Sequence, residues 1–426
     1  MERYDLLYRL YDEYETDTIR DVQRFVDLFP PVDSRFALGH WEEAQRELDR
    51  HKGEIREAFA DGATLAEVAA YADRESAFTA LDLLSTYGRS VNALVLDVDE
   101  TLRSAGRTDN EIPRETLHIL TEFHERGVPI VICTGQTLEN VKGFAIQGLG
   151  NELVNSGRVS IVYEGGTGVF TPARGERTKR LLYEELDAEI TEVFEAVRAR
   201  VLREAPETVR RGCHLQGNEF NVTLKPNFET GSERAEAVID DALLHLLKLL
   251  GETIVEFAEF GGKRDGDSRK NGDRGAEWAR AFYANDDPEI SEMLERNGVD
   301  PVGDDSPQIP EPVRAAFERI DVAYYRADAA EITALELDKP AGVEAALSVL
   351  GIEDPFVLVM GDSTSDLRVM EWARERNAGI AAAPEHASRD VLRHVRSTDD
   401  LVFGRGRSAD VLRTAYVLTL LASLDR

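Results

Sequence analysis

Two carboxylates one residue apart, Asp97 and Asp99, follow an apolar run that ends at Leu96. The run is typical of a buried strand, and in an open parallel sheet ligands bind beyond the carboxyl ends of the strands. Because side chains alternate along an extended backbone, the chain must turn between the two residues for both to face one ligand. The pair predicts a site for a small, highly charged group, although by itself it fits a solvated acidic turn better.

Three later segments reverse that preference. Each places polar residues at the end of a predicted buried strand or at the start of a predicted helix. In chain order they are Thr134 and Gly135 after the strand 128–133, Lys339 at the start of an amphipathic helix, and Asp362, Ser365 and Asp366 after the strand 356–360. Together with the first pair, they form a coherent site for a phosphoryl group.

These residue types match the chemistry of phosphoryl transfer. Asp97 can attack phosphorus and form an aspartyl phosphate, and Asp99 can protonate the leaving oxygen and later activate water. Mg²⁺ prefers carboxylate oxygens and water, which Asp97 and Asp362 would provide. Thr134 and Lys339 can hold and neutralise phosphate oxygens.

The order of these motifs resembles the haloacid dehalogenase (HAD) superfamily. The resemblance rests on Asp97-x-Asp99-x-Thr101, Thr134-Gly135, Lys339 and Gly361-Asp362-x-x-x-Asp366, and it covers about residues 89–170 and 333–421. It implies Mg²⁺ as cofactor, with catalytic roles for Asp97, Asp99, Thr134 and Lys339, phosphate contacts from Thr101, Gly135 and Ser365, and metal contacts from Asp97, Asp99, Asp362 and Asp366. For Asp366, holding water or Lys339 stays open beside direct metal binding.

Within the superfamily the chain is most similar to phosphatases with a large α/β cap, such as archaeal phosphoglycolate phosphatase and sucrose-phosphate phosphatase. The strand 159–163 and the turn after it resemble their third strand and Glu-Asn-Gly turn, with Gly165 in place of the Asn. Ser365 stands where many relatives have Asn, and Glu100 where this branch usually has Gly. Arg103 fits a substrate contact and a solvated surface residue equally well.

The pattern predicts an α/β fold with a doubly wound parallel sheet. Strands at 92–96, 128–133 and 159–163 alternate with helices near 113–126 and 137–147. We expect three parts: a helical N-terminal extension over 1–88, a HAD-like catalytic core over 89–170 and 333–426, and an inserted α/β cap domain over 171–332. The extension should include helices near 39–60 and 63–87, and its role is open between capping the core, dimerising, gating the site and simple packing.

The insertion should contain both helices and strands. The patterns predict helices at 182–203 and 231–250, strands at 219–224, 253–260, 322–325 and 332–337, and mobile polar loops at 261–275 and 302–312. A closing cap excludes water and contacts the part of the substrate beyond the phosphate. Candidates for those contacts, each of which also fits a surface residue, are Arg210, Arg211, Asn218, Asn221, Lys225 and Lys263.

The formal net charge of −31 argues against nucleic acid or an anionic membrane as partner. The acidic residues are spread along the chain, and only eight of the 50 basic residues are lysines. Such a surface favours a halophilic protein in a cytoplasm of very high salt, where screening suppresses self-repulsion. An acidic protein with a basic partner is the alternative.

The two cysteines, Cys133 and Cys213, do not indicate a disulfide framework, and Cys133 should be a small core residue. The chain shows no apolar run of membrane-spanning length and no leader pattern, which favours the cytoplasm.

These observations predict a Mg²⁺-dependent phosphomonoester hydrolase for a small soluble phosphate ester, either a sugar phosphate or phosphoglycolate. The alternatives are a phosphosugar mutase of the phosphomannomutase type and a regulatory or scaffold protein that only binds phosphate. The sequence leaves a homo-oligomer open.

Overall fold

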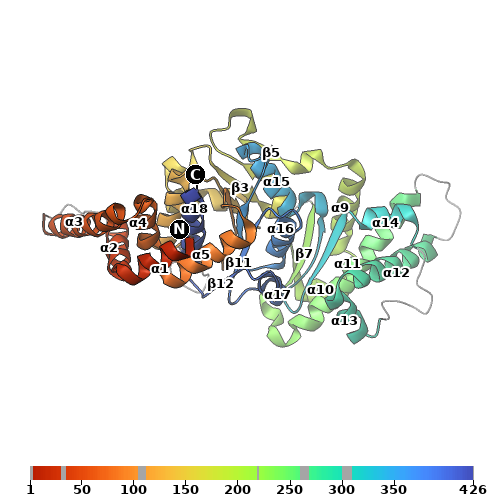
Figure 1. The fold of residues 1–426 in the computed structure, drawn as a ribbon. Coiled ribbons are helices and arrows are strands. Elements are labelled where there is room, and N and C mark those ends of the chain that lie inside the picture. The colour runs from red at the N-terminus through yellow and green to blue at the C-terminus, as the bar shows by residue number, and fades with distance from the viewer. Residues whose placement is uncertain are drawn as a thin grey trace. The chain divides into compact units, whose positions relative to one another are not determined.

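A computed structural model describes the chain in six stretches. These are residues 3–29, 35–103, 112–217, 220–259, 268–299 and 309–425. The chain divides into two compact units, one formed by residues 1–180 with 342–426 and the other by residues 181–341. Figure 1 follows the chain through both, and each unit is described by itself.

The first unit is built on an eight-stranded sheet with the order β12-β11-β10-β1-β2-β3-β4-β5. Its strands are β1 (Ala93–Leu96), β2 (Ile130–Cys133), β3 (Val159–Tyr163), β4 (Gly168–Phe170), β5 (Lys179–Leu181), β10 (Val357–Met360), β11 (Gly379–Pro384) and β12 (Leu401–Phe403). Neighbours from β12 to β3 pair in parallel, and β4 runs antiparallel to β3. The central strands are continuous apolar runs because helices bury both faces of such a sheet.

Strand β1 lies between β2 and β10, so the strand order reverses there. From β1 the chain builds β2 and β3 on one side and later returns to form β10 on the other. In a doubly wound sheet this reversal opens a crevice at the carboxyl ends of the strands. The expected α/β fold class, with its parallel sheet and helical N-terminus, is confirmed.

Helices connect the strands of the first unit. They are α6 (Arg114–Glu125), α7 (Leu138–Leu149), α8 (Asn151–Val154), α15 (Lys339–Leu350), α16 (Thr364–Glu375), α17 (Arg389–Ser397) and α18 (Ser408–Ala422). Short 3₁₀ turns also occur, among them η1 (Glu164–Gly166).

The N-terminal segment is helical throughout its described residues. It contains α1 (Arg3–Glu13), α2 (Thr16–Leu28), α3 (Arg35–Ala58), α4 (Gly62–Tyr71) and α5 (Arg74–Tyr87). Helices α4 and α5 contact α18, and α2 contacts α6. Because one hydrophobic cluster runs from Leu7 and Leu65 into Leu418, the segment shares the core of the first unit.

The single helix expected over 63–87 is instead two helices. The break falls at Ala72–Asp73, where the Asp73 side chain accepts a hydrogen bond of 2.8 Å from the backbone N–H of Ser76. Aspartate at this position caps a helix N-terminus, so it starts α5 as a separate element.

The second unit has a four-stranded antiparallel sheet in the order β6-β7-β9-β8. Its strands are β6 (Cys213–Gln216), β7 (Asn221–Pro226), β8 (Ile320–Tyr325) and β9 (Ala329–Ala334), and its helices are α9 (Ala188–Val201), α10 (Glu207–Gly212), α11 (Ser232–Glu259), α12 (Ser268–Asp286), α13 (Pro288–Arg296) and α14 (Glu311–Phe317). Helix α11 contacts β7 and β9, where Val222, Leu224 and Ile332 are buried.

The strand expected over 253–260 is wrong, because residues 253–259 form the last part of α11. The β-branched residues Thr253, Ile254 and Val255 favour a strand, but tertiary packing overrides such preferences. A Cβ atom on Gly251 would lie 2.0 Å from the carbonyl oxygen of Gly275, so the backbones of α11 and α12 touch at these two glycines. Their packing requires that α11 continue past residue 250.

Three other expectations for the second unit also need correction. Residues 268–275 belong to α12 and are not a loop, and the helix expected from 182 begins at Ala188 after a 3₁₀ turn, η3 (Leu182–Glu185). Of the second expected loop, 302–312, residues 311 and 312 are helical and begin α14. Residues 261–267 and 302–308 lie outside the described residues, as do the candidates Asn218 and Lys263.

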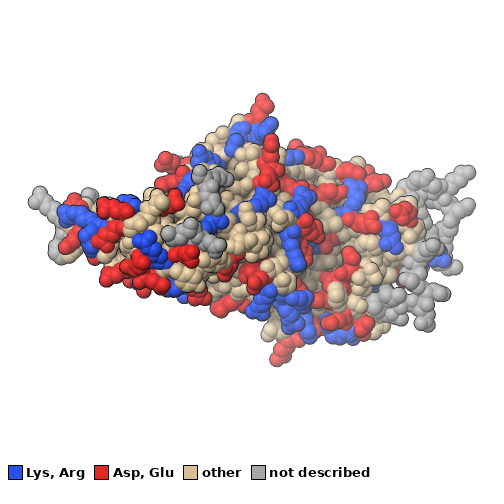
Figure 2. All heavy atoms as spheres, in the orientation of Figure 1, with Lys and Arg blue, Asp and Glu red and all other residues tan. Residues whose placement is uncertain are grey.

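Figure 2 shows acidic and basic side chains interspersed over the face displayed. Both cysteines are buried and free of disulfide bonds. Among the described residues, the helices are all too short or too polar to cross a membrane.

Candidate active site

Three carboxylates converge where β1 and β10 end. Asp97 directly follows β1, and its backbone N–H extends the ladder by donating to the carbonyl oxygen of Met360 at 2.9 Å. Asp362 follows β10 after one glycine. One oxygen from each of Asp97, Asp362 and Asp366 lies within 4.8 Å of the others. Asp97 and Asp366 are buried and Asp362 is half-buried.

The donor set fits a hard divalent cation. Carboxylate oxygens are the ligands that Mg²⁺ prefers in proteins, and grouped negative charges in a buried place are costly unless compensated. The three aspartates come from two separate parts of the chain, which the parallel pairing of β1 with β10 brings together.

Asp366 holds the turn that carries Asp362. Its Oδ2 atom accepts hydrogen bonds from the backbone N–H groups of Asp362 (3.2 Å) and Ser363 (3.0 Å), and from the Ser363 hydroxyl (2.6 Å). A Cβ atom on Gly361 would lie 2.2 Å from that of Asp366, so this position requires glycine. These contacts give Asp366 a further role, support of the turn, beside the direct metal binding and the holding of water or Lys339 left open above. The Ser365 hydroxyl lies 2.9 Å from that of Ser363.

Asp99 is held by two donors that the sequence reading did not identify as its partners. Its Oδ1 atom accepts from Nε (3.0 Å) and Nη2 (2.8 Å) of Arg103, and its Oδ2 atom accepts from the Gln136 amide. The Arg103 side chain is only 11% exposed, so it is not a solvated surface residue. The available signals were the close spacing of Arg103 to Asp99 and the position of Gln136 right after Thr134-Gly135.

The loop after β2 is tied to the turn after β3. The buried Thr134 accepts a hydrogen bond at Oγ1 from the backbone N–H of Gln136 (3.1 Å), and its carbonyl oxygen accepts one from Gly165 (3.0 Å). The Gln136 carbonyl oxygen accepts from Glu164 (2.9 Å). A Cβ atom on Gly135 would meet no other atom within 4 Å. The loop therefore presents an open backbone beside a fixed threonine.

Two further predicted residues are buried. Lys339 opens α15, whose residue Gly342 packs against β3: a Cβ atom there would lie 2.4 Å from Cγ1 of Val162. Because α15 leads into the amino end of β10, its own start points toward the carboxyl edge of the sheet. Thr101 is 3% exposed, and its hydroxyl has no hydrogen-bond partner within the described part of the chain.

A comparison with protein families matches one segment of the chain. Residues 94–166 match the family described as haloacid dehalogenase-like hydrolase. That segment holds β1, β2 and β3 with Asp97, Asp99 and Thr134, so the resemblance inferred from the motifs is confirmed. Over residues 94–166 the chain is therefore similar to haloacid dehalogenase-like hydrolases.

Several solved structures are similar to this chain at low identity. A HAD subclass IIB sugar phosphatase is 17% identical, covering 76% of this chain and 96% of its own, with a TM-score of 0.40. Haloacid dehalogenase-like hydrolases from Bacteroides thetaiotaomicron (15%, 77% and 99%) and B. subtilis (14%, 76% and 99%) both have a TM-score of 0.39. No curated relative matches the chain in sequence. The likeness to haloacid dehalogenase-like hydrolases therefore rests on the matched residues 94–166.

Proposed function

We propose that this protein is a Mg²⁺-dependent phosphomonoester hydrolase with Asp97 as the nucleophile. The convergence of Asp97, Asp362 and Asp366 at the strand-order reversal, with Asp99 two residues from the nucleophile, is the observation that supports it. Asp97, Asp362 and the backbone carbonyl of Asp99 would hold the ion. When bound, Mg²⁺ would neutralise the charge on the transferring phosphate.

The reaction would proceed in two steps. A carboxylate oxygen of Asp97 bonds to phosphorus while the bond to the ester oxygen breaks, and Asp99 gives a proton to the departing alcohol. Asp99 then takes a proton from water, whose oxygen bonds to phosphorus as the acyl phosphate bond breaks. Phosphate leaves and the Asp97 carboxylate is restored.

Arg103 and Gln136 would act through Asp99 in this scheme. They fix the direction of the carboxyl group through which the proton passes in both steps. Proton transfer requires a donor within hydrogen-bond reach of the reacting oxygen, so orientation of this group matters for the rate.

The phosphate group would lie against the loops after β1 and β2. Thr134 and Lys339 would hold its equatorial oxygens, where added negative charge develops. Gly135 leaves space for close approach of the phosphate, and the unpartnered Thr101 hydroxyl is a polar group that a ligand or water would satisfy.

A sugar phosphate is the substrate class we favour. On the face of the second unit's sheet opposite α11, Thr223 donates to Glu331 (2.7 Å), Asn221 donates to Thr333 (2.8 Å), and Thr333 donates to Glu331 (3.0 Å). Hydroxyl, amide and carboxylate groups of this kind suit sugar hydroxyls better than the second anion of phosphoglycolate. Lys225 and Arg211, two other candidates, form ion pairs with Asp328 (3.9 Å) and Glu207 (2.8 Å).

Phosphate release from a panel of phosphomonoesters tests the proposal. The panel should include hexose phosphates and phosphoglycolate, with Mg²⁺ present and molar KCl as one condition. The native protein should release phosphate and Asp97→Asn should not. Binding of substrates without turnover by folded, Mg²⁺-loaded native protein would contradict hydrolysis and favour a phosphate-binding role.

A further inference from the structure

Glu100, between Asp99 and Thr101, has an unfavourable backbone conformation. Its φ angle is +57°, in the left-handed region that residues with a Cβ atom rarely adopt. Glycine is the residue for which this conformation is inexpensive. A non-glycine residue persists in such a conformation when its surroundings compensate for it, and such sites cluster near function.

The imidazole of His386 and the guanidinium of Arg405 face the Glu100 side chain. Its Oε2 atom lies 3.3 Å from Nε2 of His386 and 3.7 Å from Nη2 of Arg405. The same His386 nitrogen lies 3.0 Å from the carbonyl oxygen of Glu100, a hydrogen bond in which the ring N–H donates. Segments that follow β11 and β12 therefore contact Glu100 twice, by a hydrogen bond to its backbone carbonyl oxygen and by close approach to its buried carboxylate oxygen.

The loop 385–388 also contacts the other carboxylate segment. The backbone N–H of Ser388 donates to the carbonyl oxygen of Asp362 at 2.8 Å. The loop is itself fixed to β12, because Glu385 donates from its N–H to the carbonyl oxygen of Phe403 at 2.8 Å. One short loop thus hydrogen-bonds to the turn that carries Asp99 and to the residue that carries the second carboxylate.

We propose that the loop 385–388 and Arg405 form a clamp that sets the spacing between the Asp97–Asp99 turn and Asp362. His386, Glu100 and Arg405 are positioning residues: they act through the aspartates and do not touch the reacting atoms. The catalytic consequence rests on the proposed function, whereas the consequence for Mg²⁺ affinity does not depend on turnover.

Glu100→Gly separates positioning from simple stability. Glycine relieves the backbone strain, so the Tm should stay unchanged or rise, while loss of the side chain releases the clamp. Outer partners of metal ligands typically affect affinity or activity by about 10- to 100-fold. We therefore expect Mg²⁺ affinity, measured by isothermal titration calorimetry, to fall about tenfold and kcat to fall more than KM changes.

Matched variants complete the test. Ala173→Gly introduces glycine at an exposed position that also has positive φ (65°) and should leave Mg²⁺ affinity and kcat unchanged. Glu100→Gln keeps an oxygen that can accept from His386 and should recover part of the loss. His386→Ala should weaken Mg²⁺ binding like Glu100→Gly, and the double variant should lose less than the sum, because both break one contact.

The outcomes distinguish the clamp from the proposed function. Unchanged Mg²⁺ affinity in folded Glu100→Gly and His386→Ala would overturn the clamp, as would a fall in Tm alone. If native protein binds Mg²⁺ but releases no phosphate, the proposed function fails while the affinity comparison still decides the clamp. Native protein that binds no Mg²⁺ would overturn both.

Discussion

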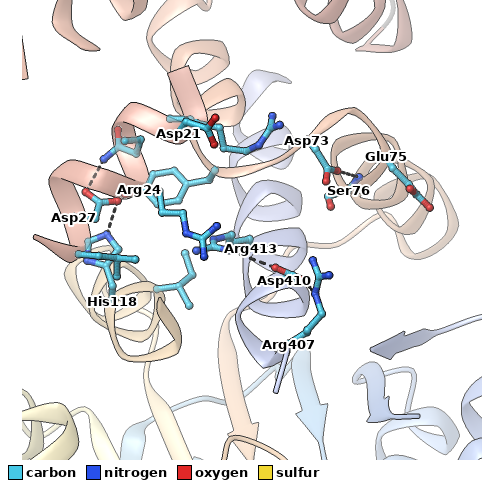
Figure 3. A pocket seen from close by; sticks show the side chains of 16 residues that line it. Asp21, Arg24, Asp27, Asp73, Glu75, Ser76, His118, Arg407, Asp410 and Arg413 are labelled. Atoms are coloured by element: carbon cyan, nitrogen blue, oxygen red, sulfur yellow. Dashed lines mark hydrogen bonds and ion pairs between the residues drawn. The ribbon is translucent and has the colours of Figure 1, made fainter. Parts of the chain in front are cut away.

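Two regions of the first unit concentrate ionisable side chains, and they arrange them differently. At the carboxyl edge of the sheet, three aspartates place oxygens within 4.8 Å of one another. In a pocket of about 350 Å³ between α2, α5, α6 and α18, acidic and basic groups alternate (Figure 3). Two of the lining residues, Arg24 and Arg413, also pair with Glu115 on α6, with Arg413 at 2.9 Å, and Asp410 pairs with Arg413 and Arg407.

The contrast shows how charge arrangement separates a structural cluster from a reactive one. Burial alone would raise the pKa of Glu115, but hydrogen bonds and positive charge from Arg413 and Arg24 outweigh it and lower the pKa below its ordinary value. The pairs of Glu115 with Arg24 and Arg413 compensate these charges within the protein, and they join α2 to α6 and α18. Grouped carboxylates at the sheet edge instead favour an added cation.

The comparison is sharpened most by Asp97→Asn. Removing the proposed nucleophile should lower phosphate release by roughly 10³-fold or more. In buffer without Mg²⁺ the Tm should be unchanged or higher, because one of three grouped negative charges is gone. Phosphate release and thermal unfolding of both proteins measure this. Retained release by Asp97→Asn would assign the nucleophile elsewhere.

Arg103→Gln tests whether a cation inside the reactive region serves chemistry or stability. Loss of its contact with Asp99 should reduce kcat by about 10- to 100-fold, at or below the lower end of the roughly 10²- to 10⁴-fold that general acid–base catalysis contributes, with a smaller change in KM. Arg158→Gln, which changes an exposed arginine of the same unit, is the control. If Arg103→Gln lowers the Tm but leaves kcat unchanged, Arg103 contributes to stability and not to the chemistry.

The reactive region was predictable because its residues lie at the ends of local patterns. Asp97, Thr134 and Asp362 each follow an apolar run that identifies a buried strand. Parallel strands bring their carboxyl ends to one edge of the sheet. The contacts of Arg103 and Gln136 with Asp99, and of His386 with Glu100, were not recognised, because they depend on how the loops fold and meet. In the same way, the Gly251–Gly275 contact that extends α11 cannot be inferred from β-branched residues alone.

In the alternating region, Glu115→Gln should have the opposite effect on stability from Asp97→Asn. It leaves two arginines without their shared carboxylate, so we expect a loss of about 1–3 kcal/mol in unfolding free energy. Mg²⁺ affinity should not change. Chemical denaturation measures the unfolding free energy of Glu115→Gln, with Glu57→Gln, a change at an exposed residue of α3, as the control.

The effect of Glu115 should also depend on pH. Its folded-state pKa is lowered, so its stabilisation is present above the unfolded value of 4.5 and is lost as pH falls through the folded pKa. The difference between native protein and Glu115→Gln should therefore shrink below about pH 4.5. A difference that stays constant through this range would mean that the carboxylate's charge contributes nothing.

The smallest expected effect belongs to the His118–Asp27 ion pair, 2.9 Å long, which joins α6 to α2 beside the same pocket (Figure 3). Burial lowers the pKa of His118, but Asp27, with Glu122, raises it above the ordinary 6.5 overall. The pair thus contributes fully below pH 6.5 and is lost as pH rises through the folded pKa. Because His118 is partly exposed, we expect less than about 1 kcal/mol.

Unfolding free energies between pH 6 and 9 measure this contribution. Native protein should lose stability relative to His118→Asn as pH rises, whereas His40→Asn, at an exposed site on α3, should run parallel to native protein. A native curve parallel to that of His118→Asn would show that the alternating region is held by Arg24, Arg413 and apolar packing without help from this pair. The N-terminal helices would then dock on the core independently of pH above 6, as the arginine pairs predict.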